Sequence, residues 1–130
     1  MPTPDPLFGA LAPALRVHGE RLGVLAGNIA NADTPGFKAR DIDFRNVLQG
    51  VQGAQLPATR TQPGHLDGGG ISSVGSPTQW RVPTQPSADG NTVETPVEQA
   101  AYMDAALRYQ AALRFIDGRM SSYRLAIQGS

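Results

Sequence analysis

The residue types that most often carry out catalysis or hold metals are few and scattered in this sequence of 130 residues. It contains no cysteine, which excludes disulfides, thiol catalysis and thiolate metal sites. His18 and His65 are far apart, and neither has a second ligand at a spacing typical of metal sites. Asp41 and Asp43 lie two residues apart, which suits a turn or a helix cap better than an acid–base pair. These observations predict a protein that is not an enzyme and has no catalytic residue, cofactor or metal site.

Phosphate, nucleic-acid and lipid recognition are also poorly supported. The run Gly68-Gly69-Gly70 is not followed by the Lys and Ser or Thr of a phosphate-binding loop. Eleven basic residues balance eleven acidic ones, whereas a nucleic-acid-binding domain or a protein that docks on anionic lipid carries a basic excess. Only Lys38 among the cations is a lysine, and the rest are arginines, which are enriched at protein interfaces. The composition therefore favours protein partners.

The sequence shows no membrane span and no cleaved signal peptide. Its most apolar stretch, residues 22–32, contains two asparagines and is far shorter than the roughly 20 residues that span a bilayer. The N-terminus has no basic region, and its apolar residues are interrupted by Pro13, Arg16, His18 and Glu20. We expect no direct membrane insertion, while export by an uncleaved, receptor-read route remains open.

The first 35 residues are predicted to form an N-terminal helical arm. Apolar side chains recur at alternating spacings of three and four, which is typical of a coiled coil, and only His18 interrupts them. His18 is expected to be a packed core or interface residue. Asp5 and Pro6 favour a helix start, and Pro13 predicts a kink or a restart. The predicted seam is Phe8, Leu11, Leu15, His18, Leu22, Leu25 and Ile29.

Three glycines recur every four residues along this arm, at Gly19, Gly23 and Gly27. One interpretation is a weakened helix, because each glycine costs up to about 1 kcal/mol relative to alanine. The other is a stripe of small residues that lets a neighbouring helix approach closely. The strict spacing favours close approach.

Residues 95–130 are predicted to form a C-terminal helical arm. Thr95 can cap it, Pro96 suits the first helical position, and Glu98 would complete a capping box. Asp104 and Arg108 form a pair in the favourable order. The periodic pattern exceeds three heptads, which indicates a coiled coil. Its seam is Tyr102, Ala106, Tyr109, Leu113, Ile116, Met120, Tyr123 and Ile127.

Residues 36–94 form a loop-rich middle segment with nine of the 15 glycines and five of the 11 prolines. A short amphipathic helix is predicted from Asp43 to Gln49, capped by Asp43 and ended by Gly50 or Gly53. Residues 80–82 and 91–93 are strand-like on either side of an Asp-Gly turn and predict a small β-hairpin. Residues 56–79 have no period and predict a long exposed loop. The expected fold is mainly α, with the two arms paired as an antiparallel-type coiled coil.

The junction between the first arm and the middle carries a distinct motif. Pro35 and Gly36 predict a type II turn, because proline presets the second position and glycine supplies the positive φ of the third. Asn28 and Asn31 share a helix face and can bond backbone groups across a packed interface. On chemistry alone, a helix end followed by a turn accounts for these residues.

The same stretch resembles the signature of the flagellar axial proteins, the family of rod, hook and hook–filament junction subunits. In that signature a helix ends in Asn-Ile-Ala-Asn, followed by Thr-Pro-Gly and an aromatic residue. Residues 37–44, 81–83 with 89–93, and 106–110 are similar to proximal rod members of the family, whereas residues 55–79 match nothing in it. The signature residues, expected to mediate interactions, are Asn28, Ile29, Asn31, Thr34, Pro35, Gly36 and Phe37.

The resemblance implies a structural subunit of the bacterial flagellar basal body, in the periplasmic rod near the membrane. Its terminal helices would polymerise into the axial drive shaft and export channel that motility needs. It implies as partners other rod proteins, further copies of the chain, the rod-base adaptor (of the FliE type) and the inner-membrane MS ring. It also implies type III export without signal cleavage. The alternative is a soluble coiled-coil adaptor or export chaperone that does not polymerise.

Overall fold

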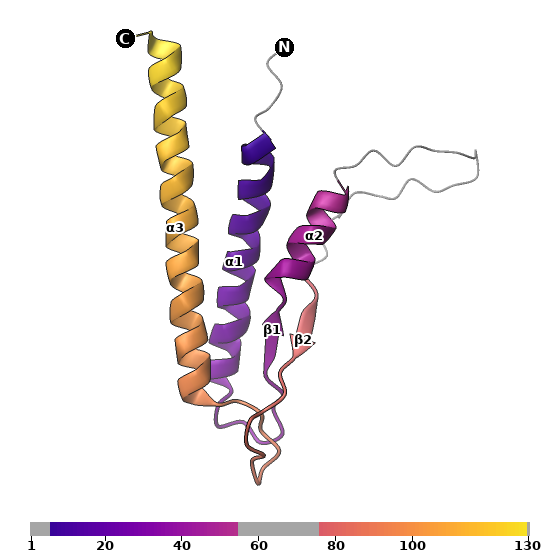
Figure 1. Ribbon diagram of the computed structural model, residues 1–130. Helices are drawn as coiled ribbons and strands as arrows, with labels where there is room; N and C mark the ends of the chain where they lie inside the picture. The colour runs from indigo at the N-terminus through magenta and orange to yellow at the C-terminus, as the bar shows by residue number, and fades with distance from the viewer. Residues whose placement is uncertain (1–5, 55–75, 130) are drawn as a thin grey trace, which may run out of the picture.

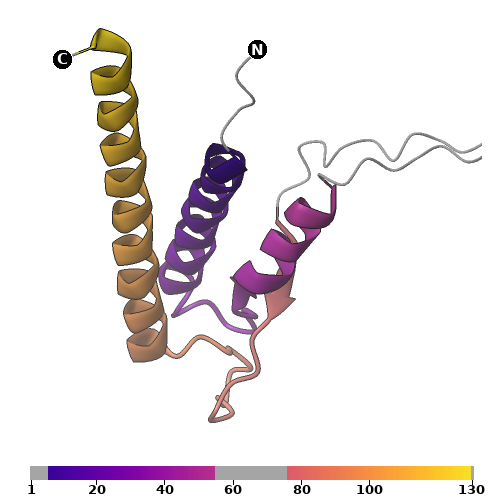
Figure 2. The ribbon, with the colours of Figure 1, turned by 45° about the horizontal axis from the view of Figure 1, so that its top comes forward.

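The computed structural model describes residues 6–54 and 76–129, with side chains for residues 11–50 and 76–129. Its elements are α1 (Pro6–Ala30), β1 (Arg40–Ile42), α2 (Phe44–Ala54), β2 (Thr78–Trp80) and α3 (Thr95–Gln128). The helices α1 and α3 lie side by side and antiparallel, and β1, β2 and α2 lie on the other side of α1 (Figures 1 and 2). The prediction of a mainly helical fold with paired terminal helices is confirmed.

Some predicted features lie outside the described residues: the Asp5 cap, the Phe8 side chain, His65, the three consecutive glycines, and the loop over residues 56–75. In the described part of the chain, no helix is both long enough and apolar enough to cross a membrane.

The helix α1 is continuous from Pro6 to Ala30 and includes Pro13, so the prediction of a restart is wrong. A proline in a helix removes one backbone hydrogen bond. The neighbouring alanine and leucine residues are strong helix formers and favour continuation on both sides.

The predicted seam of α3 does not coincide with the most buried face of that helix, whereas the seam residues His18 and Leu25 of α1 are buried. On α3 the fully buried residues are Glu98 and Ala105, whereas seam residues such as Leu113 and Met120 remain exposed. At about 100° per residue, the centre of the predicted seam lies about 50° around the helix from Ala105. Small alanines therefore face α1, and the larger apolar side chains flank this contact.

The glycine stripe of α1 faces α3 only at one end. A Cβ on Gly19 would lie 3.6 Å from the Tyr109 ring, which is ordinary contact, while none of the described atoms lies within 4 Å of one on Gly23 or Gly27. No other element of the described chain approaches Gly23 or Gly27, so close approach at these two positions stays a prediction for a helix of another molecule.

The helix α2 begins where its cap predicts. The Oδ1 atom of Asp43 accepts hydrogen bonds from the backbone N–H groups of Arg45 at 3.1 Å and Asn46 at 3.3 Å. The helix then continues to Ala54, so the predicted stop at Gly50 or Gly53 is wrong. Glycine lowers helix propensity by only about 1 kcal/mol and does not by itself end a helix.

The two-stranded antiparallel sheet is confirmed, but its strands differ from the predicted hairpin. Arg40 is the partner of Trp80, and Ile42 is the partner of Thr78. Thr78 and Gln79 of β2 fall within the predicted loop, and Trp80 within the predicted strand. Residues 91–93 lie instead along residues 36–39, where Thr92 N–H donates to the Phe37 carbonyl at 2.9 Å. The turn at Gly90 forms with φ +75°. Sequence proximity suggested a local hairpin, whereas both segments hydrogen-bond to the chain after α1.

Candidate functional site

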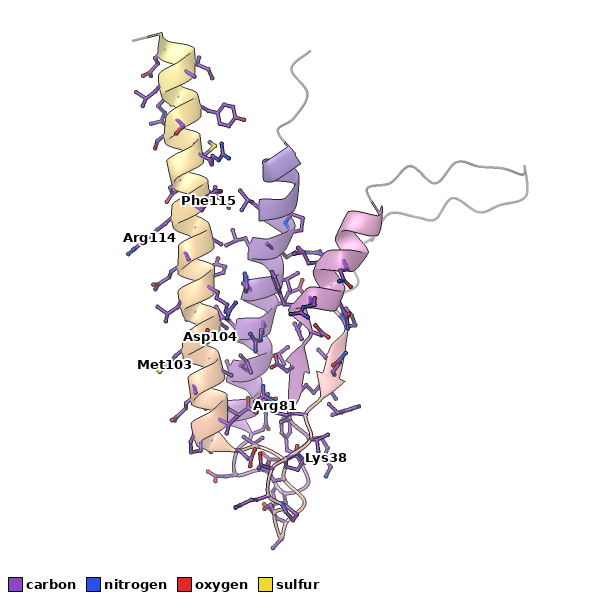
Figure 3. The ribbon with its side chains drawn as sticks, in the orientation of Figure 1. Lys38, Arg81, Met103, Asp104, Arg114 and Phe115 are labelled. Carbon is purple, nitrogen blue, oxygen red and sulfur yellow. The ribbon has the colours of Figure 1, made fainter. Side chains whose placement is uncertain are left out.

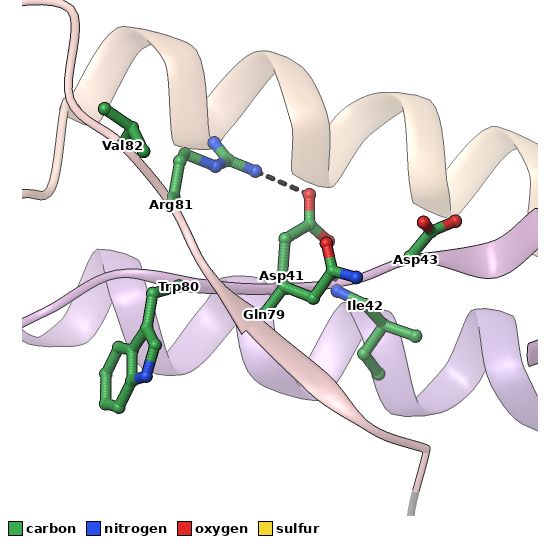
Figure 4. A pocket seen from close by; sticks show the side chains of 7 residues that line it. All are labelled: Asp41, Ile42, Asp43, Gln79, Trp80, Arg81 and Val82. Carbon is green, nitrogen blue, oxygen red and sulfur yellow. Dashed lines mark hydrogen bonds and ion pairs between the residues drawn. The ribbon is translucent and has the colours of Figure 1, made fainter. Parts of the chain in front are cut away.

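A cluster of four charged side chains lies where α1, β1, the chain after β2 and α3 meet. Arg21 donates from Nε and Nη2 to the two carboxylate oxygens of Asp41, at 2.8 and 3.1 Å. Arg81 donates from Nη2 to Asp41 at 2.6 Å, as Figure 4 shows, and from Nη1 to Glu98 at 2.8 Å. Two guanidinium groups thus balance two carboxylates. We call Arg21, Asp41, Arg81 and Glu98 the charge cluster.

Asn28 extends the charge cluster to the backbone of β1. Its Nδ2 donates to the Arg40 carbonyl at 2.6 Å and to Oε2 of Glu98 at 3.0 Å, and its Oδ1 accepts from Arg40 N–H at 3.1 Å. Asn28 is only 2% exposed and Glu98 is fully buried. The prediction that Asn28 bonds a backbone across a packed interface is confirmed.

Glu98 does not complete a capping box, and that prediction is wrong. The residue before the helix is Glu94, and its side chain makes no capping hydrogen bond. The Glu98 carboxylate turns instead to Arg81 and Asn28. A fully buried carboxylate needs a cation and several donors, which the cluster supplies and the N-terminal N–H of a helix alone does not.

Hydrogen bonding shifts the pKa values of Asp41 and Arg21. Burial raises the pKa of Asp41, but hydrogen bonds from Arg21, from the Ile42 N–H and from Arg81 lower it more, so that it lies below the ordinary 3.8. The hydrogen bond to Asp41 raises the pKa of Arg21. Both shifts favour the charged forms of Arg21 and Asp41, so this ion pair is maintained at neutral pH.

Hydrogen bonds from Asn91 stabilise the turn after α1. Phe37 N–H donates to the Thr34 carbonyl at 3.3 Å, and Gly36 has φ +72°, so the predicted turn is confirmed. The Nδ2 of Asn91 reaches the carbonyl oxygens of Asn31, Ala32 and Thr34 at 3.1, 2.8 and 2.9 Å. The segment before α3 therefore closes over the end of α1.

Asn31 behaves differently from Asn28. Its Nδ2 donates to the Gly27 carbonyl of its own helix at 2.8 Å, and its Oδ1 accepts from the Thr34 hydroxyl at 3.1 Å. The side chain stabilises the helix end locally, so the predicted bond across an interface is wrong for Asn31.

The predicted site residues fall into three environments. Asn28 and Leu25 are buried; Ile29, Asn31 and Phe37 are half-buried; Thr34, Pro35 and Gly36 are exposed. In the predicted seams, Leu11, Leu15, Leu22, Tyr109 and Ile116 are half-buried, whereas Tyr102, Leu113 and Tyr123 are exposed. The structure brings the junction motif together with the charge cluster and leaves much of the α3 seam uncovered by the described chain.

The charge cluster and the residues around it have a structural role. Asp41 and Asp43 line one shallow pocket beside β2 (Figure 4), but Asp43 caps α2 while two arginines hold Asp41. Among the described residues, no group of three His, Asp or Glu side chains could hold a metal ion. The carboxylates that could act as bases are already paired, so the contacts position four segments relative to one another.

The sequence pattern did not identify the residues that join the segments: Arg21, Arg81, Asn91 and the buried Glu98. These residues are separated by up to 77 positions along the chain, counting from Arg21 to Glu98. Two signals were available: the predominance of arginine, which is suited to bidentate pairing with carboxylates, and the family resemblance of residues 81–83 and 89–93, which contain Arg81 and Asn91.

Comparisons of the sequence with known proteins point to one family. A family model described as flagella basal body rod protein matches residues 15–38, which cover the second half of α1 and the turn. The chain is 41% identical to the flagellar basal body rod protein FlgB of Aeromonas hydrophila, over 96% of this chain and 95% of the relative. It is 38% identical to FlgB of Salmonella typhimurium, over 89% and 88% respectively, and 42% identical to FlgB of Cereibacter sphaeroides, over 94% of each. The chain therefore belongs to the FlgB family of flagellar basal body rod proteins and is a structural protein of that rod, not an enzyme.

Proposed function

We propose that the chain is built into the rod through its two helical arms, residues 1–35 and 95–130, while residues 36–94 form an elaboration outside the helix pair. The layered arrangement supports this division, because the described middle elements lie on the side of α1 away from α3 (Figure 1). The charge cluster would fix the angle between the arms and the middle segment. Each subunit would thus enter the rod with one defined shape.

The observation that carries this proposal is the exposed apolar surface of α3. Met120 is 54% exposed and Ile127 is 83% exposed, and Leu113 and Tyr123 on the same face of the helix are also exposed. The helix α3 has 34 residues and α1 has 25, and the C-terminal end of α3 extends beyond α1 (Figure 1). Large exposed apolar surfaces mark interaction sites. The names of the relatives point to other rod components as the partners.

The same surface of α3 suggests the specific binding partners. We assign to it further copies of the chain and adjacent rod proteins, and to the membrane-proximal end of the assembly the rod-base adaptor and the MS ring. Thr34, Pro35 and Gly36 are exposed at the opposite end of the subunit and are proposed to contact a neighbour there. The chain would reach its periplasmic position through type III export without signal cleavage.

The test is a pair of substitutions on α3, Met120→Asp and Ser121→Asp. Both positions are exposed in the subunit, so each aspartate stays solvated and the fold is retained, which circular dichroism of the purified chain will show. In the rod, Met120→Asp would bury a charge in an apolar contact. We expect a strain carrying Met120→Asp to lose motility and assembled rods, and a strain carrying Ser121→Asp to keep both. Normal rods with Met120→Asp would overturn the assignment of this surface.

A further inference from the structure

His18 lies at the contact between α1 and α2 and is not part of the charge cluster. Its side chain is 9% exposed, and its ring stacks on that of Phe44, the first residue of α2, with centroids 4.4 Å apart and planes 16° apart. The Nδ1 atom is buried and has no hydrogen-bond partner among the described residues. A neutral imidazole tolerates this arrangement when its proton is on Nε2, because Nδ1 is then only an unused acceptor.

A protonated imidazole fits the same position poorly. Its Nδ1–H would become a buried donor without an acceptor, which is costly. The Phe44 ring attracts a cation and works in the opposite direction. However, burial lowers the pKa of His18 most, and the nearby charges of Arg108 and Arg21 lower it further, while Asp104 raises it less.

None of the described carboxylates near His18 is free to neutralise an imidazolium. On α3, Asp104 is bound to Arg108 at 2.9 Å and lies 4.0 Å from Arg21 (Figure 3 labels Asp104). At the start of α2, Asp43 accepts hydrogen bonds from the helix itself, and the neighbouring Arg45 is exposed.

The remaining acidic groups on this side of α1 are also engaged. On β1, Asp41 is held by two arginines, and on α1 the Glu20 carboxylate accepts from Ser76 N–H at 2.9 Å. A charge on His18 would therefore meet two guanidinium groups and no free carboxylate of the described chain.

We propose that His18 is a pH-sensitive latch that holds α2 against α1 when neutral and releases α2 when protonated. The folded pKa lies below the ordinary 6.5, so the docked state binds fewer protons than the undocked state. Docking is therefore complete above pH 6.5 and weakens as the pH falls from 6.5 through the folded pKa. The docking equilibrium falls by about tenfold for each pH unit that separates the two pKa values.

Mild acidification isolates this latch from the other contacts. The pKa values of Glu20 and Asp41 both lie below their ordinary values of 4.5 and 3.8, so these carboxylates stay charged in the range where His18 titrates. A change in α2 between about pH 7.5 and about pH 5.5 therefore reports on His18 among the described residues.

The experiment combines two measurements on the full chain. An NMR titration gives the pKa of the His18 imidazole, which we expect below 6.5. Amide hydrogen exchange, corrected for the intrinsic effect of pH on exchange, compares residues 44–50 with residues 100–112 of α3. We expect protection of α2 to fall on mild acidification while protection of α3 is unchanged.

Two variants complete the design. His18→Phe keeps an aromatic ring for stacking but cannot be protonated, so the pH dependence of α2 protection should disappear. Phe44→Leu removes the ring that covers His18. Because burial is the largest cause of the lowered pKa and outweighs the attraction of the ring for a cation, the His18 pKa should move towards 6.5. A wild-type His18 pKa of 6.5 or above would overturn the latch even if neither variant folds, as would an unchanged pH dependence in His18→Phe.

Discussion

Replacing Arg81 with methionine tests whether the charge cluster holds the subunit together. Arg81 donates to Asp41 at 2.6 Å and to Glu98 at 2.8 Å, and thereby joins the chain after β2 to both β1 and α3. Methionine keeps the length of the side chain but supplies no charge and no donors. Asp41 would retain Arg21 as a partner, whereas the fully buried Glu98 would retain only Asn28 among the described side chains.

The magnitude follows from these burials. Removing one partner of a buried ion pair costs about 3–5 kcal/mol, because it leaves a charge without compensation. The Arg81 side chain is 19% exposed and that of Asp41 is 24% exposed, so water screens this half of the cluster. We therefore expect Arg81→Met to lower the free energy of unfolding by about 3 kcal/mol, at the lower end of that range. Since a small domain has only about 5–15 kcal/mol in total, the loss should be easy to measure.

The assay is urea unfolding of the purified chain, followed by circular dichroism, for Arg81→Met, Glu98→Gln and the double variant. The double-mutant cycle isolates the coupling between the two side chains. We expect the double variant to be more stable than the sum of the single losses predicts, because the neutral amide removes the uncompensated charge. Arg114→Met is the matched control, since Arg114 is exposed on α3 (Figure 3), and it should change stability by less than about 0.5 kcal/mol. A loss at Arg81 no larger than at Arg114, or strictly additive effects, would refute the structural role of the cluster.

Three further predictions concern single positions and pH. Gly23→Ala should stabilise the chain by up to about 1 kcal/mol in thermal unfolding, because a Cβ there meets none of the described atoms within 4 Å. Asn91→Ala should cost about 1–3 kcal/mol in urea unfolding, because it leaves three carbonyl groups at the end of α1 without their shared donor. Glu20, through hydrogen bonding by Ser76, and Asp41 have lowered pKa values, so their stabilisation is present above about pH 4.5 and lost below it. Stability measured against pH should therefore show a loss below about pH 4.5 that Asp41→Asn reduces.

The local features of the fold could be predicted because they depend on neighbouring residues. The cap by Asp43 and the turn at Pro35 and Gly36 each need only residues within three or four positions. The two long helices follow from periodicity in the same way. Asn28 could also be identified as a residue that bonds a backbone, although the sequence does not say which backbone.

The charge cluster could not be predicted because its members come from four separate segments. A sequence pattern shows that Glu98 suits the first turn of a helix, but not that Arg81 will lie beside it. The β1–β2 pairing failed for a related reason. The Asp-Gly turn forms as expected. However, the segments on either side of it, residues 80–82 and 91–93, hydrogen-bond to the chain after α1 and not to each other.

The position of the heptad pattern on α3 supports a role beyond the single subunit. If the pattern served only the contact with α1, its large side chains would be the most buried residues of the helix. Instead Ala105 is fully buried, while Met120 and Ile127 are 54% and 83% exposed. A period sustained over more than three heptads is difficult to explain as surface variation, because isolated exposed apolar residues follow no regular spacing. We infer that the seam is completed by neighbouring molecules in the rod, and that the alanine face sets the spacing of α1 and α3 within each one.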